Sequence, residues 1–295
     1  MISFRTHVVT LVAVFLALAI GVVLGGGPLS EIGRGAENTE ALQADVEKAQ
    51  AEAAFGERFA TDASAVLYTQ KLEGREITVV TMPGADPSLV ETLTDEIDGA
   101  GGEVVVTQEL GSSFVNPTEK SLVDTLGSQL MTQLPNGTVS ADASTYERAG
   151  ELLGFTVATR GEQTVERSAE SEAVADGLTG ANLLPEVASG SGRAPLVLVV
   201  LGDEVTGDGA DAILGGIVRG LAAKSRGVVL AGRTTSDDSQ LARLREADEL
   251  GAASSVDGVE TAAGRVATVL ALARAYDTQG GAFGATGSDG SLPLG

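Results

Sequence analysis

The longest apolar run in the chain covers residues 8–27 and reads VVTLVAVFLALAIGVVLGGG, with Thr10 as its only polar side chain. About 20 helical residues span the roughly 30 Å hydrocarbon core of a bilayer. Arg5 precedes the run and acidic residues outnumber basic ones just after it, which favours a cytoplasmic N-terminus. The run therefore predicts a single-pass anchor within residues 1–27, in the cell membrane, with the C-terminal part of the chain exported.

A cleaved secretory signal peptide is the alternative interpretation of the same run. The apolar region of a signal peptide is about 7–15 residues long and ends in a small-residue cleavage site. This run is longer and continues into Gly25–Pro28 without an A-x-A pattern. These features favour an uncleaved anchor, and under both interpretations the remainder of the chain is exported.

A heptad-like stalk is predicted over residues 28–75, because residues 37–73 lack Pro and are rich in Ala, Glu, Gln and Lys. Small and aliphatic residues recur there at a/d spacing. This heptad seam consists of Leu42, Val46, Ala49, Ala53, Gly56, Ala60, Ala63 and Leu67. We expect it to bind another envelope or membrane protein, or a second copy in a homodimer. Packing of the helix on its own domain is the alternative, since each Ala buries little area.

An exported α/β domain is predicted over residues 76–278. Apolar segments at 77–81, 104–106, 196–201 and 228–231 are typical of buried strands, and helical periodicity separates them. This order predicts an open, mostly parallel, Rossmann-like sheet with helices on both faces. Residues 161–193 are expected to hold a helix and a long connection, and the Gly-rich residues 279–295 a loose, flexible tail.

Three loops should lie at the carboxyl ends of the strands, where such sheets bind ligands. Residues 82–86 lack the G-x-G-x-x-G fingerprint of dinucleotide sites. Residues 202–211 hold four carboxylates without EF-hand spacing, and acidic residues also suit a helix N-terminus. In residues 232–238, Arg233 could hold an anion, although capping by Ser236 or Asp237 explains the pattern. The sequence thus predicts no catalytic, cofactor or metal site, and a non-enzymatic protein.

The composition further limits the partners and the types of site that are possible for this chain. With 19 Lys and Arg against 41 Asp and Glu, the formal charge is −22, so repulsion from phosphates argues against nucleic acid as a partner. The chain has no Cys and one His. The absence of Cys excludes disulfides and cysteine-ligated iron–sulfur centres, and the single His7, at the edge of the predicted anchor, has no neighbour that could complete a Ser–His catalytic set.

The opening MISFRTHVVTLVAVFLALAIGVVLGGGPLS and the ending GGAFGATGSDGSLPLG resemble those of the actinobacterial copper-transporter family of MctB-like envelope proteins. The resemblance extends over anchor, stalk, α/β domain and tail. It implies a role in copper efflux or homeostasis and a place in the cell envelope, including the outer envelope. It also implies an alternative role for related chains, as non-enzymatic coiled-coil partners in a cell-division complex that regulates peptidoglycan hydrolysis.

The residues argue against a dedicated copper site within one chain. Copper(I) prefers Cys and Met sulfur and copper(II) prefers imidazole. Met1, Met82 and Met131 lie far apart in the sequence, and His7 stands alone. Copper is therefore a partner by resemblance only, and the chain is expected to act by protein assembly.

Overall fold

The computed structural model describes residues 28–186, 188, 192–234 and 239–294. The predicted anchor over residues 8–27 lies outside the described residues. Among those that are described, no helix combines the length and the apolar character needed to cross a membrane. The chain divides into two compact units, residues 1–56 and residues 57–295.

Helix α2 (Pro28–Tyr68) corresponds to the predicted stalk. It starts at a Pro, which suits a first helical turn because that turn has no use for its N–H. It ends seven residues before the predicted end of the stalk, because Leu72 is fully buried and its N–H donates to the Ala100 carbonyl at 3.0 Å. We call residues 57–68, which belong to the second unit, the base of α2, and residues 42–56 the arm.

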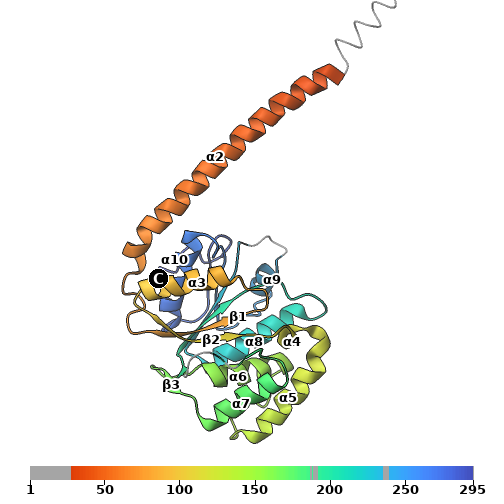
Figure 1. The fold of residues 1–295 in the computed structure, drawn as a ribbon, viewed down its shortest axis with the longest axis vertical. Coiled ribbons are helices and arrows are strands. Elements are labelled where there is room, and N and C mark those ends of the chain that lie inside the picture. The colour runs from red at the N-terminus through yellow and green to blue at the C-terminus, as the bar shows by residue number, and fades with distance from the viewer. Residues whose placement is uncertain (1–27, 187, 189–191, 235–238, 295) are drawn as a thin grey trace, which may run out of the picture. The chain divides into compact units, whose positions relative to one another are not determined.

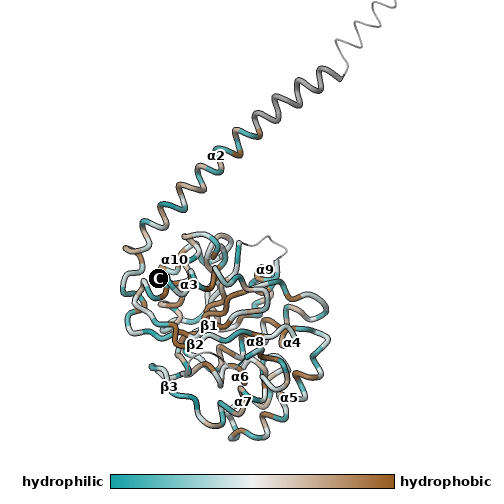
Figure 2. Tube along the Cα trace, viewed as in Figure 1, coloured by the Kyte–Doolittle hydropathy of each residue, from teal (hydrophilic) through white to brown (hydrophobic). Residues whose placement is uncertain are grey.

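The second unit is built on a six-stranded sheet in which all neighbouring strands run parallel (Figure 1). The strands in spatial order are β2 (Glu103–Glu109), β1 (Glu76–Thr81), β5 (Leu196–Val200), β6 (Gly227–Ala231), β7 (Ser254–Val256) and β8 (Ala282–Phe283). Figure 2 shows the central strands as strongly apolar, as expected for strands covered on both faces. A short antiparallel ribbon joins β3 (Val165–Glu166) and β4 (Gly192–Arg193).

Helices cover both faces of this sheet, which confirms the predicted α/β class. Side chains of β5 alternate between the two faces, with Val197 and Val199 in one core and Leu196 and Leu198 in the other. The second core is closed by α3 (Pro87–Gly99), α10 (Ala262–Ala275) and the end of α2. The first core is closed by α4 (Ser112–Val115), α5 (Lys120–Gln133), α6 (Thr145–Val157), α7 (Ala169–Gly180), α8 (Ala210–Lys224) and α9 (Gln240–Glu246).

Two local features come directly from the sequence. The Asp86 side chain accepts a hydrogen bond from the Ser88 N–H at 3.0 Å and starts α3, with Pro87 at the first helical position. Helices α6 and α8 cross at glycines, and a Cβ on Gly220 would lie only 2.2 Å from the Glu147 carbonyl oxygen. That crossing therefore brings two backbones into direct contact.

Four strands were not predicted from the sequence, namely β3 and β4 of the short ribbon and β7 and β8 at one edge of the main sheet. Strand β7 is formed by Ser-Ser-Val, which has no apolar alternation, and β8 belongs to the Gly-rich ending. Asp257, which is fully buried, links the Gly-rich C-terminal segment to the rest of the domain. Its carboxylate accepts hydrogen bonds from the Thr286 N–H at 3.0 Å and from Arg245 at 2.9 Å.

Candidate functional site

The carboxyl ends of β1 and β5 meet where the connections diverge along the sheet, the place where doubly wound folds hold ligands. Here the Asp203 N–H donates to the Pro83 carbonyl at 3.0 Å. A Cβ on Gly202 would lie 2.1 Å from the Pro83 oxygen and 2.3 Å from the Ala85 nitrogen. The loops after β1 and β5 are thus in direct backbone contact at this point.

A cavity of about 250 Å³ lies next to it, between the ends of β5 and β6. Arg233 lines this cavity, but its Nη2 is paired with Asp86 Oδ2 at 2.7 Å. Hydrogen bonds from the Ser88 hydroxyl and N–H, helped by the charge of Arg233, lower the pKa of the Asp86 carboxyl. Arg233 therefore joins two loops, and the capping residues expected beside it, Ser236 and Asp237, lie outside the described residues.

The acidic loop at 202–211 holds helices in place. Arg243 Nε lies 2.8 Å from Asp211 Oδ2, and this hydrogen bond lowers the pKa of Asp211. Glu204 accepts a hydrogen bond from the Gln240 N–H at 2.9 Å. The described residues contain no group of three or more His, Cys, Asp or Glu side chains arranged to hold a metal ion.

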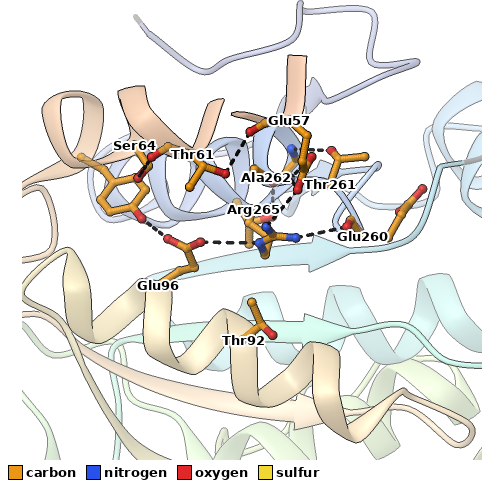
Figure 3. Close-up of polar contacts among 12 residues, drawn as sticks. Glu57, Thr61, Ser64, Thr92, Glu96, Glu260, Thr261, Ala262 and Arg265 are labelled. Atoms are coloured by element: carbon orange, nitrogen blue, oxygen red, sulfur yellow. Dashed lines mark hydrogen bonds and ion pairs between the residues drawn. The ribbon is translucent and has the colours of Figure 1, made fainter. Parts of the chain in front are cut away.

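A polar cluster joins the base of α2 to α10 (Figure 3). Both carboxylate oxygens of Glu57 accept from the Ala262 N–H, at 3.0 and 2.9 Å. Thr261, the N-cap of α10, accepts from the Gly264 N–H at 3.1 Å. Two N–H groups in the first turn of α10 have no acceptor within the helix. One donates to the N-cap Thr261, and the other donates to Glu57, which is 205 positions away in the sequence.

Arg265 ties the same cluster to α3. Its Nη2 lies 3.4 Å from Glu57, its Nε 3.5 Å from Glu96, and its side chain is only 16% exposed. Glu96 also accepts a hydrogen bond from the Tyr68 hydroxyl, at the other end of the base. Figure 3 shows Arg265 reaching both carboxylates from α10. These contacts determine which face of the base is turned inward.

That orientation divides the heptad seam into two parts. Ala60 and Ala63 are half-buried, and Leu67 packs against the second core, so this part of the seam lies against the domain itself. The side chains of the arm part are exposed. Its members are Leu42, Val46, Ala49, Ala53 and Gly56. Pairing of the seam with a partner stays a prediction for the arm.

Glu57, Glu96 and Arg265 were not predicted as a cluster. They come from three different helices, α2, α3 and α10. A Glu or an Arg at such a position is also common on an ordinary exposed helix surface.

Comparison with known proteins identifies the family. A family model described as "Copper transport outer membrane protein, MctB" matches residues 1–294. The chain belongs to this family. The proteins named "Copper transporter MctB" from Mycobacterium tuberculosis (strain ATCC 25618 / H37Rv) and Mycobacterium bovis are each 28% identical over 304 residues, which cover 92% of both chains. The Mycobacterium leprae protein of the same name is 28% identical over 300 residues. The resemblance noted from the two ends of the sequence is confirmed as membership of the MctB family.

Proposed function

We propose that this MctB-family chain is a membrane-anchored envelope protein that serves copper homeostasis by binding another protein through the arm of α2. The observation that carries the proposal is the exposure of large apolar side chains on the arm. Leu42 is 64% exposed and Val46 is 54% exposed. Covering such groups is favourable by about 25 cal/mol per Å² of apolar surface, which favours a helical partner. The description of the family as a copper transport outer membrane protein, and the name of its relatives as copper transporters, support the envelope and copper parts of the proposal.

The burial of the methionines supports a function through protein assembly rather than through a copper site in the domain. Met82 is 3% exposed and lies in the first core, and Met131 packs against the same core. Their sulfur atoms therefore serve apolar packing, which is the common use of Met in cores. Without Cys, the described domain has no other thiolate or thioether to offer copper(I).

The proposal is tested by a charge introduced on the arm. We expect Leu42→Lys with Val46→Lys to abolish co-purification of the partner from detergent-solubilised envelopes, because the partner would have to bury two ammonium groups. Leu67 is left unchanged, since a Lys there would disturb the second core. Gln43→Lys with Glu47→Lys is the matched control, because both residues are exposed neighbours off the seam.

The cellular readout is copper content under copper stress. The wild-type chain should restore low copper to a deletion strain, and the Leu42→Lys, Val46→Lys variant should not. Unchanged partner recovery together with normal copper would contradict the proposal.

A further inference from the structure

A continuous series of hydrogen bonds leads from the base of α2 to the loop after β6, which consists of Gly232–Thr234. Arg265 Nη1 donates to the Glu260 carbonyl at 3.1 Å. The Glu260 carboxylate in turn accepts from the Thr234 N–H at 3.1 and 3.0 Å. A second link is the Val259 N–H, which donates to the Gly232 carbonyl at 3.2 Å. The turn before α10 therefore contacts the α2 side through Arg265 and the loop after β6 through Glu260.

Two ion pairs connect this series of hydrogen bonds to both ends of α3. Arg233, next to Thr234, pairs with Asp86 at the N-cap of α3, and Glu96 near the other end of that helix pairs with Arg265. Glu260 is held in its charged form, because hydrogen bonds from Thr234 and the charge of Arg233 lower its pKa although burial opposes this. The base of α2, α3, the start of α10 and the loop after β6 thus share one polar network, and Figure 3 shows the part of it around Glu57, Glu96 and Arg265.

Apolar contact holds the base at its C-terminal end, where Tyr68 is 5% exposed and Leu67 packs against the second core, and it is sparse toward Glu57. Between Glu57 and Leu67, its inward side presents Ala60, Ala63 and Ser64, all only half-buried. Small side chains bury little area, so much of the attachment rests on Glu57, Arg265 and Tyr68. Such an attachment can open without unfolding the sheet, because local openings draw on local contacts.

We propose that the base of α2 is a detachable latch whose attachment keeps the loop after β6 ordered. When the base leaves, the Ala262 N–H loses its Glu57 acceptor and Arg265 loses one of its carboxylates. The turn of Gly258–Thr261 then loosens, and with it the Glu260 contact that holds Thr234 at the cavity between β5 and β6. A partner that pulls on α2 would thereby change the carboxyl end of the sheet. The latch acts within the domain and does not depend on which partner binds the arm.

Hydrogen–deuterium exchange of the full-length protein, read by mass spectrometry without any partner, tests the latch. Glu57→Gln removes the charge and keeps the shape, and loss of a charge-assisted hydrogen bond corresponds to about a tenfold change in an opening equilibrium. We expect about tenfold faster exchange in peptides covering 258–266 and 230–234, with β1 and β5 unchanged. Glu52→Gln is the matched control, because Glu52 is exposed on the same helix and pairs only with Lys48 in the described contacts.

Reciprocity gives a second, independent variant. If the two sites share one opening equilibrium, Glu260→Gln must speed exchange in residues 57–68 by the same mechanism. Faster exchange at 258–266 with no change at 230–234 would overturn the coupling. No change in either segment, or an equal acceleration in β1 and β5, would overturn the latch itself. Loss of partner binding by the arm variant would leave these results unaffected, so the two proposals fail separately.

Discussion

The crossing of α6 and α8 permits a sharp test of the packing, in which Gly220 is changed to Ala. The new methyl carbon would lie 2.2 Å from the Glu147 oxygen, 2.5 Å from the Glu151 nitrogen and 2.6 Å from the Gly150 carbonyl carbon. Ordinary C···O contacts are roughly 3.3 Å or longer, so the two helices must separate by about 1 Å. The opposing atoms are backbone and cannot rotate away.

The magnitude follows from two opposing effects. A gap of about 1 Å forfeits a quarter to a half of each dispersion contact, and overpacking of this kind costs about 1–3 kcal/mol. Replacing Gly by Ala in a helix returns about 1 kcal/mol. Because the opposing backbone is rigid, we take the cost at the upper end of that range, about 3 kcal/mol, and expect a net loss of about 2 kcal/mol in the free energy of unfolding, or roughly 4–8 °C in Tm.

Urea unfolding followed by circular dichroism measures this loss. Gly99→Ala is the control, because a Cβ there meets nothing within 4 Å at the end of α3. It should leave stability unchanged or slightly raised. A Gly220→Ala protein as stable as the wild type would refute the close backbone crossing.

The remaining predictions concern ion pairs and copper. Asp257→Asn should destabilise the domain by about 3–5 kcal/mol in urea, because it leaves the mostly buried Arg245 without its charge partner; an effect below 1 kcal/mol would speak against the pair. Asp211 has a pKa below its usual 3.8 in the folded state, so its contribution is present above that pH and is lost as the pH falls through the lowered folded value. The stability difference between the wild type and Asp211→Asn should therefore be constant above about pH 5 and shrink in more acidic solution, and a difference that grows there would contradict the assignment. Calorimetry of the purified protein with copper should show no stoichiometric binding beyond weak carboxylate association, and tight one-to-one binding would contradict a role by assembly.

Sequence patterns predicted the fold class because the strongest signals in this chain are local. The apolar run ending at Leu201 predicted β5, and the Asp86-Pro87 pair predicted the start of α3, which a side-chain cap confirms. Strand β7 was missed because Ser254 and Ser255 are buried through hydrogen bonds with Gly280 and Gly281, which no periodicity reveals. Local periodicity therefore predicted the central strands and the helices. The edge formed by β7 and β8 depends on pairing between segments that no local pattern reveals.

The candidate site illustrates the same limit. Heptad spacing predicted an apolar face on α2, but the pattern continues unchanged from the arm into the base. Contacts made in the folded domain, such as those of Glu57 with Ala262 and Arg265, show that the base turns its part of the seam toward its own domain. Those contacts join residues more than 200 positions apart, so no window of sequence contains both partners.

The measurement that tests the central claim most directly is photocrosslinking in intact cells from a probe placed at Val46. The absence of Cys also allows a thiol-linked probe at this single position. We predict one defined crosslinked protein, lost when Leu42→Lys is added and lost when the probe is moved to Glu47. A crosslinking pattern that is identical from Val46 and Glu47, or unaffected by Leu42→Lys, would contradict binding of a partner through the exposed face of the arm.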